Sequence, residues 1–347
     1  MNDPLSDRLR PEMQALCRNL CWCICGLLVL GSLVVFLGFY AGKPVPLSNP
    51  VPDPVYLMNY DTSTLPPTES NLEIRLGYEV FMNTSVFLGP EQPDPDRLFS
   101  GNRLACANCH LNAGTKPFGA PLIGVVKRFP QYRGREDKIG TIEERVNGCM
   151  ERSMNGRKMP EEMPEMRALI AYLSWLGRYA PKDGKVLGQG FLPLEIPERA
   201  VDLVHGEAVF QTHCTVCHGS DGQGQASPAG GYAYPPLWGD DSFNNGAGMT
   251  RVITAAQFIK GNMPFGVTWD RPLLTDEEAY DVAGYINSRL RPDKPNRELD
   301  FPDLSKKPVS TPYGPFADPF PPIQHQMGPF QPIMDYYKKE FNIIKSK

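Results

Sequence analysis

The chain has 347 residues, which is room for two or three domains, and its net charge of −4 argues against nucleic acid as a partner. Four of its nine cysteines crowd one apolar stretch (Cys17, Cys21, Cys23, Cys25) and four more lie in two short motifs. Cys149 alone is left over, so the composition excludes a disulfide-stapled fold.

An uncharged apolar run covers residues 19–42, and a helix of that length spans about 36 Å, enough to cross a bilayer. Arginines at positions 8, 10 and 18 precede the run, so the positive-inside rule places residues 1–18 in the cytoplasm. We therefore predict a single transmembrane anchor at 19–42, with a cleaved signal peptide as the alternative. Prolines at 44, 46, 50, 52 and 54 then predict an extended spacer over residues 43–70.

Two segments read Cys-x-x-Cys-His, the attachment signature of haem c. The residues are Cys106, Cys109 and His110 in the first segment, and Cys214, Cys217 and His218 in the second. In each, two thiols on one side of a short helical turn bind the haem covalently, and the histidine reaches the iron. A structural zinc site needs four Cys or His ligands, and no second cysteine pair lies at suitable spacing.

The motifs therefore predict two covalently bound haem c groups. Such attachment implies a compartment outside the bacterial cytoplasm. We expect the haem domains in the periplasm, anchored in the inner membrane.

The same plan appears twice along the chain. Each copy opens with a glycine and an aromatic residue four positions apart, Gly77 with Phe81 and Gly206 with Phe210, on one face of a helix. A haem motif follows, and an amphipathic helix closes each copy, at 166–176 and at 275–290. Thr275 and Glu278 form a capping box at the start of the second closing helix.

This repeat predicts a mainly α-helical protein with two tandem cytochrome c-like domains after the N-terminal transmembrane helix. The expected bounds are 71–180 for the first domain and 199–292 for the second. Residues 181–198 link them, and a proline-rich extension covers 293–347. Aromatic residues in that extension favour docking onto a domain surface over free disorder.

The second axial ligand differs between the two domains. Met263, in Asn262-Met263-Pro264, lies between the second haem motif and the closing helix, where a thioether ligand is expected; such a ligand raises the haem potential. In the first domain both Cys149 and Met159 lie on the distal segment. A thiolate there lowers the potential and also attacks sulfur–sulfur bonds. The spacing leaves Cys149 and Met159 open as alternatives.

Basic residues collect around Cys149, and guanidinium forks bind small oxyanions in bidentate fashion. The group comprises Lys116, Arg133, Arg135, Arg145, Arg152 and Arg157. We expect at least two of them to pair instead with nearby glutamates, Glu143, Glu144 or Glu151, or with haem propionates.

These residues resemble the thiosulfate dehydrogenase family of dihaem cytochromes c, over residues 71–332. The matching segments are Cys106 to Leu111, Ala113 to Pro117, Phe129-Pro130, Arg145, Cys149 to Gly156, the helix at 165–176, Cys214 to His218, Tyr234 to Trp238, Gly246 to Met249 and Asn262 to Pro264. The specific feature is the combination of a distal cysteine in the first domain with Asn-Met-Pro in the second.

The resemblance implies an oxidoreductase that joins two thiosulfate ions into tetrathionate, or runs in reverse, at the first haem. His110 and Cys149 would ligate the first iron, and His218 and Met263 the second. The resemblance also implies a substrate site with Arg135, Arg145, Arg152 and Ser153.

Electrons would pass to a soluble cytochrome c or to a membrane oxidase. The alternative from another class is a membrane-anchored dihaem subunit of a respiratory complex that only transports electrons. A reductase would use the same site in reverse.

Overall fold

The computed structural model describes residues 15, 18–22, 24–28, 30–32 and 50–346. Most of the predicted N-terminal segment 1–18, half of the predicted anchor and the start of the spacer lie outside these residues. Within the described part, no helix is long and apolar enough to span a membrane. The chain divides into two compact units, Met1–Ser48 and Asn49–Lys347, and both haem motifs belong to the second.

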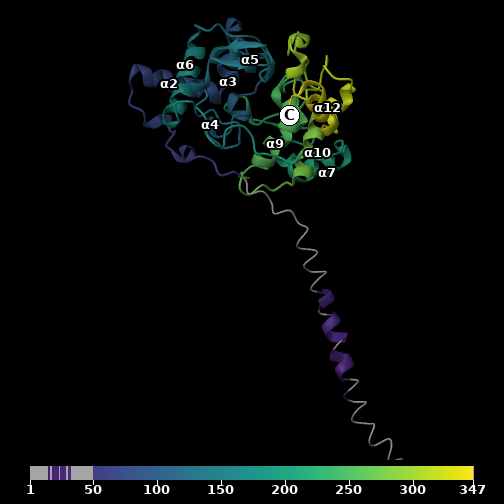
Figure 1. Ribbon diagram of the computed structural model, residues 1–347. Coiled ribbons are helices and arrows are strands. Elements are labelled where there is room, and N and C mark those ends of the chain that lie inside the picture. The colour runs from purple at the N-terminus through teal and green to yellow at the C-terminus, as the bar shows by residue number, and fades with distance from the viewer. Residues whose placement is uncertain (1–14, 16–17, 23, 29, 33–49, 347) are drawn as a thin grey trace, which may run out of the picture. The chain divides into compact units, whose positions relative to one another are not determined.

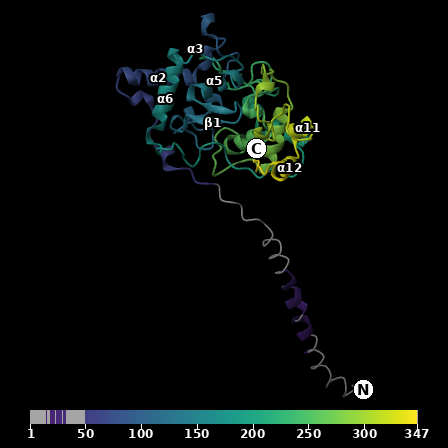
Figure 2. The same ribbon diagram turned by 45° about the horizontal axis from the view of Figure 1, so that its top comes forward.

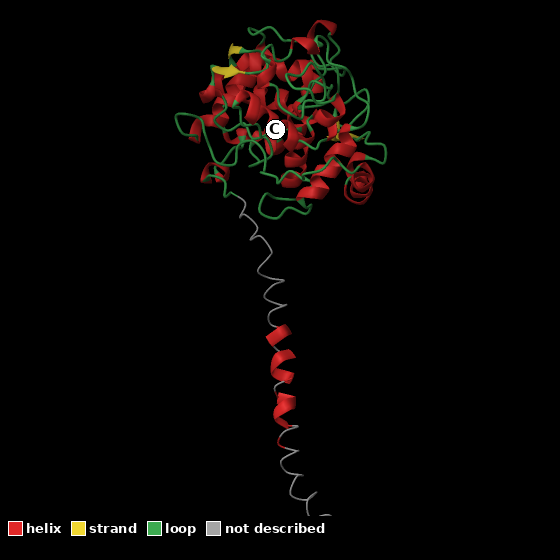
Figure 3. Ribbon diagram, turned by 45° about the vertical axis from the view of Figure 1, so that its right-hand side comes forward, coloured by secondary structure: helices red, strands yellow, loops and turns green. Residues whose placement is uncertain are grey.

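The second unit is mainly helical, with two short antiparallel hairpins (Figure 3). The described α-helices of this unit are α2 Glu69–Met82, α3 Thr84–Leu88, α4 Leu111–Gly114, α5 Ile142–Arg152, α6 Pro164–Leu176, α7 Leu203–His213, α8 Thr215–His218, α9 Val252–Asn262, α10 Asp276–Asn287, α11 Pro322–Met327 and α12 Gln331–Phe341. The strands are β1 Gln131–Arg133 paired with β2 Lys138–Gly140, and β3 Gln225–Ala226 paired with β4 Tyr232–Tyr234. Tyr132 lies opposite Ile139 in the first hairpin.

The opening and closing helices of each repeat cross at a glycine. In the first repeat α2 packs on α6, as Figures 1 and 2 show, and a side chain at Gly77 would overlap the Ala168 carbonyl oxygen. In the second, α7 packs on α10, and a side chain at Gly206 would overlap the Asp281 carbonyl oxygen. The predicted helix pairs and the capping box at Thr275 are confirmed.

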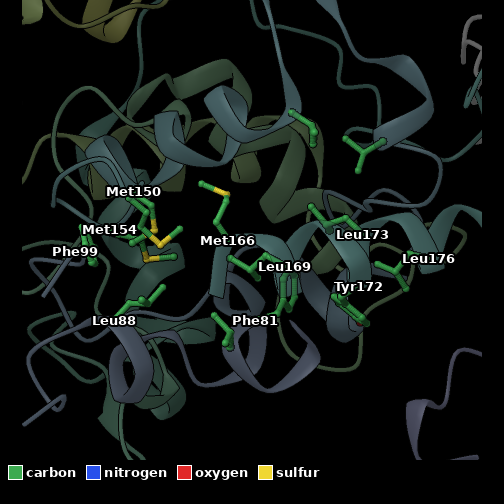
Figure 4. Packing of buried hydrophobic residues seen from close by; sticks show 14 of the residues in the cluster. Phe81, Leu88, Phe99, Met150, Met154, Met166, Leu169, Tyr172, Leu173 and Leu176 are labelled. Atoms are coloured by element: carbon green, nitrogen blue, oxygen red, sulfur yellow. The ribbon is translucent and has the colours of Figure 1, made fainter. Parts of the chain in front are cut away.

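Each helix pair encloses its own core. In the first, Phe81 of α2 and Met166, Leu169 and Tyr172 of α6 are almost fully buried and pack together (Figure 4). Burying large apolar side chains in this way contributes about 1.5–3 kcal/mol each. The core holds α5 against the pair, and α5 carries the distal cysteine.

The C-terminal extension completes the second core. Phe330, Ile333 and Tyr337 are buried together with Phe210 and Tyr280 of the second repeat. Docking of the extension is therefore confirmed, and the extension contains the helices α11 and α12. The prolines lie mostly before and between the short helices, at positions where they start a turn of helix without interrupting one.

Residues 53–70 also differ from the free spacer that proline content predicted. Asp53 and Leu187 exchange two hydrogen bonds, of 2.9 and 2.7 Å, and Tyr56 packs against Ile123 and Val186. Tyr60 joins the first core. The apolar side chains of this segment pack against the surface of the first domain, and this packing keeps the segment docked despite its proline content.

Polar contacts join the two repeats directly. The Arg103 guanidinium donates to Asp241 at 2.7 Å and to the Tyr232 hydroxyl at 2.8 Å. The buried Asn102 amide donates to the carbonyl oxygens of Ser153 and Ser242. The two repeats form one folding unit, and the linker is only one of several connections between them.

Candidate active site

The two haem motifs hold their histidines in the same way. Cys106–Asn108 form a turn of 3₁₀-helix, after which the Nδ1 atom of His110 lies 2.6 Å from the Ala120 carbonyl oxygen. In the second motif, the Nδ1 atom of His218 lies 2.8 Å from the Pro235 carbonyl oxygen. A proton on Nδ1 is donated to these carbonyls, which leaves Nε2 of each ring free to ligate iron.

The second motif places its two thiols on one short helical turn. Cys214 caps the start of α8, and Cys217 lies within this helix directly before His218. The Cys217 amide donates to the Cys214 carbonyl oxygen at 3.3 Å, and both cysteines are half-buried. The two cysteines have different surroundings. Cys214 packs against the apolar core of the second repeat, whereas Cys217 does not belong to that cluster of described residues. Attachment of the second haem to Cys214 and Cys217 stays a prediction from the motif, and this turn is compatible with it.

Cys149 and His110 line the same cavity. Cys149 lies on α5, whose start is fixed by a capping box between Thr141 and Glu144. Arg145, one helical turn earlier on the same face, donates from Nη1 to the Cys149 sulfur at 2.9 Å. His110 is near enough to Cys149 to lower the pKa of its thiol.

The surroundings of Cys149 favour a thiolate. Burial raises the pKa of the thiol, but the Arg145 guanidinium and then the neighbouring His110 outweigh burial and lower this pKa to about 6. By contrast, burial raises the pKa of the free thiols of Cys106 and Cys109 to about 11 and about 12. Of the three cysteines in this region, Cys149 is the one whose surroundings favour the thiolate.

Met159, the alternative ligand, lies elsewhere. It is buried in the first hydrophobic core with 2% of its surface exposed, and it does not line the cavity. Its backbone amide and carbonyl are both bonded to the Asn147 side chain, at 2.8 and 2.9 Å. These bonds hold Met159 in the core.

The cavity beside His110 and Cys149 has a volume of about 400 Å³ and a basic lining. The lining includes all four of the predicted substrate residues: Arg135, Arg145, Arg152 and Ser153. Arg133 lines it too. Lys116 and Arg157 do not: Lys116 donates to the Val267 carbonyl, and Arg157 donates to the Leu98 carbonyl and lies over the Phe99 ring.

Two carboxylates hold the cavity arginines in place. Glu136 lies 2.9 Å from Arg133 and 3.7 Å from Arg152. Asp300 lies 2.6 Å from Arg135. The predicted pairing with Glu143, Glu144 or Glu151 is wrong: among the described residues the acids paired with the cavity arginines are Glu136 and Asp300. Pairing with haem propionates stays a prediction.

Sequence reasoning missed several contributors to this site, among them Glu136 and three residues far along the chain. Arg251 comes from the second repeat, immediately before α9, and Phe301 and Asp300 come from the C-terminal extension. Each is more than 95 positions from Cys149 in the chain, so no local motif links them to it. The Gly246 to Met249 segment was the nearest signal, because it ends just before Arg251 and its last two residues, Gly248 and Met249, line the same cavity.

Both sites have the groups that hold haem c. In the first, His110 and Cys149 line the same cavity, and the Cys106 and Cys109 thiols lie close enough for their charges to interact with that of Cys149. In the second, Met263 follows α9 and packs into the same apolar cluster as Cys214. Each site thus has two thiols, a distal sulfur donor, and a histidine whose Nδ1 hydrogen bond leaves Nε2 available to the iron.

Comparison with known proteins supports this assignment of the two repeats. The SoxA/TsdA cytochrome c domain family matches residues 99–181, and the cytochrome c family matches residues 203–289. Relatives include the thiosulfate dehydrogenase of Allochromatium vinosum, which is 47% identical over 198 residues, covering 56% of this chain and 72% of the relative. That of Psychrobacter arcticus is 39% identical over 243 residues, covering 70% and 71%.

A solved structure is also similar, that of thiosulfate dehydrogenase (TsdBA) from Marichromatium purpuratum in its "as isolated" form. The TM-score is 0.61 and the identity 34%. The match covers 74% of this chain but only about half, 54%, of the solved chain.

Two tandem cytochrome c domains, each with a covalent attachment motif, make this protein a dihaem cytochrome c that carries two haem c groups. The chain belongs to the thiosulfate dehydrogenase family.

Proposed function

We propose that this protein oxidises two thiosulfate ions to tetrathionate in the cavity beside Cys149, and passes the electrons through the second haem domain. The observation that carries the proposal is Cys149, which accepts a hydrogen bond from Arg145 and shares with His110 a cavity lined by arginines. Membership of the thiosulfate dehydrogenase family supports it. Cys149 and His110 are the proposed ligands of the first iron, and His218 and Met263 those of the second.

The reaction balances without protons. A sulfur–sulfur bond forms between the outer sulfurs of two thiosulfate dianions, and two electrons leave as tetrathionate, also a dianion, is produced. When bound, the two haems supply two one-electron acceptors, which matches this count. The protein residues have to bind the anions, bring the two sulfurs together and keep the distal thiolate charged.

The cavity residues suit these tasks. Guanidinium forks bind tetrahedral oxyanions through two parallel hydrogen bonds, and Arg135 and Arg152 line the cavity where such an anion would lie. The Ser153 hydroxyl, at the end of α5, adds a neutral donor. Arg145 is committed to Cys149, so its role is to hold the sulfur as a thiolate. A protein that only relays electrons needs no such cavity.

The direct test is to mix the purified oxidised protein with thiosulfate without oxygen and follow the haem absorption bands. We expect reduction of both haems without any other electron donor. Reduction by a reduced cytochrome c but not by thiosulfate would contradict the proposal and favour the electron-transfer subunit. Adding tetrathionate to the fully reduced protein measures the reverse direction in the same bands.

For cellular location, we propose a periplasmic protein held in the inner membrane by residues 19–42. The uncharged apolar run and the preceding arginines support this. Electrons would then reach a soluble cytochrome c or a membrane oxidase. Carbonate washing of membranes should leave the protein in the pellet. A soluble mature chain that begins near Gly42 would instead identify the run as a signal peptide.

A further inference from the structure

Five arginine side chains line the cavity, and four of them have a partner within the protein. The pairs are Arg145 with Cys149, Arg133 and Arg152 with Glu136, and Arg135 with Asp300. The four paired arginines all come from the first haem domain. The fifth, Arg251, comes from the second.

Arg251 is a half-buried cation without an acid. Its Nε atom donates to the Gly248 carbonyl at 3.3 Å, and among the residues that the structure describes it forms no ion pair. Burial lowers the pKa of Arg251 to about 10, and the charges of Arg135, Arg145 and Arg152 act in the same direction. Arg251 remains protonated at neutral pH, so the cavity contains a partly desolvated positive charge that no described carboxylate neutralises.

The proposed reaction consumes two dianions, and these repel each other as their sulfurs approach. Each anion therefore needs its own cation, on its own side of the forming bond. We propose that Arg251 binds the second thiosulfate ion, so that the second haem domain completes the substrate site of the first. This inference rests on the proposed function, and polar contacts join the two domains on either side of Arg251 in the chain.

Those contacts give Arg251 a defined place. The Asn244 amide donates to the Glu151 carbonyl of α5 at 2.9 Å, and the Asn262 amide donates to the Phe118 carbonyl at 2.9 Å. The two asparagines lie on either side of Arg251 in the chain. The docking of the two domains thus places the guanidinium of one against the cavity of the other.

The experiment is calorimetric titration of the fully reduced holoprotein with thiosulfate, without oxygen, so that binding is measured and no oxidation follows. We expect two thiosulfate ions to bind the wild-type protein and one to bind Arg251→Gln. Arg251→Lys keeps the positive charge but loses the bidentate guanidinium. This variant should bind two thiosulfate ions, the second at least tenfold more weakly than the wild type does. Arg271→Gln is the matched control, because it removes a cation that is 87% exposed and lies outside the cavity, and it should bind two.

Redox titration of the same variants gives a readout that does not depend on substrate. Arg251→Gln should leave the potential of the second haem within the spread of the control and lower that of the first only slightly, because one nearby positive charge is lost. The inference would be overturned if Arg251→Gln bound two thiosulfate ions or if the wild type bound only one. It would also be overturned if the variant shifted a haem potential by more than this and still bound two ions, a result that would identify Arg251 as a partner of a haem carboxylate. Failure of thiosulfate to reduce the oxidised wild type would contradict the proposed function itself, independently of these titrations.

Discussion

Cys149 and Met159 show what a sequence can and cannot decide about a single residue. Both lie on the distal segment of the first domain, and spacing alone leaves both possible as ligands. The structure separates them through their surroundings: Cys149 shares a cavity with His110 and has Arg145 2.9 Å from its sulfur, whereas Met159 is buried in the core by two backbone bonds to Asn147. The difference depends on tertiary packing, which no local pattern contains.

Replacing each of these residues should therefore have different effects. Cys149→Ser should keep both haems but change the spectrum of the first, raise its potential and lower thiosulfate oxidation by orders of magnitude. Met159→Ala should leave that spectrum unchanged and lower stability by about 2–5 kcal/mol, because it leaves a cavity in the core. Visible and electron paramagnetic resonance spectra check the first effect, and thermal unfolding checks the second. Normal activity in Cys149→Ser together with an altered spectrum in Met159→Ala would reverse the assignment.

Met263 gives a parallel prediction for the second haem. It ends α9 and packs beside Cys214, and the other described methionine of the same cluster is Met334 of α12. Met263→Ala should abolish the near-infrared sulfur-to-iron band of the oxidised protein and lower the potential of the second haem. Met334→Ala is the matched control and should keep the band. Loss of the band in the control alone would name Met334 as the ligand.

At the scale of elements, the repeat was predictable because it depends on local patterns. The glycine and aromatic residue four apart, the capping box and the amphipathic closing helices are all readable in the sequence, and the helices lie where they predict. The C-terminal extension was less predictable. Its aromatic residues indicated docking, but its place against Arg135 depends on a contact between residues 165 positions apart.

The helix crossings give a test of this element-level account. Gly206→Ala should destabilise the protein by about 1–3 kcal/mol, because the new methyl group overlaps the Asp281 carbonyl oxygen and the two helices have to separate. Gly314→Ala is the control, since the nearest atom to its new methyl group is 3.6 Å away, an ordinary contact. Thermal unfolding of the holoprotein measures both. Equal midpoints for the two variants would mean that α7 and α10 do not depend on this close approach.

Asp300 gives a test of the extension as part of the site. It lies 2.6 Å from Arg135 and accepts a hydrogen bond of 2.7 Å from the Tyr313 hydroxyl, while the Arg135 guanidinium lies over the Phe301 ring. Asp300→Asn should raise KM for thiosulfate several-fold with little change in kcat or in the haem spectra, because Arg135 loses its orientation. Asp300→Glu should recover part of the affinity. Asp303→Asn, whose side chain pairs with the surface residue Lys306, should behave as the wild type.

The same carboxylate contributes to pH dependence. Burial raises the pKa of Asp300, but the charge of Arg135 and the Tyr313 hydrogen bond outweigh burial, so this pKa lies below its usual value. A lowered folded-state pKa stabilises the protein above the unfolded value of about 3.9, and this stability is lost as pH falls through the folded value. The fall in melting temperature below pH 4 should therefore be smaller in Asp300→Asn than in the wild type. An equal fall in both would show that Asp300 is not charged in the folded protein.

At the scale of the whole molecule, the two haem domains behave as one structure. The sequence indicated two domains and a linker, but the joining contacts involve polar residues scattered over both, such as Asn102, Arg103 and Asp241. A buried polar residue without its partner costs about 1–3 kcal/mol, so these contacts hold only when the domains dock correctly. Docking places Arg251 and Phe301 in the cavity beside Cys149. The candidate site is therefore a property of the folded pair, and only the part on the first domain was accessible from local motifs.

The central claim is that two thiosulfate ions are joined beside Cys149 and give up two electrons. Counting products tests it most directly: the oxidised holoprotein is incubated with thiosulfate and an excess of oxidised cytochrome c, and tetrathionate is quantified by ion chromatography against the cytochrome reduced. We expect one tetrathionate for every two electrons with the wild-type protein, and none above background with Cys149→Ser. Reduced cytochrome c without tetrathionate, or equal tetrathionate from Cys149→Ser, would contradict the claim.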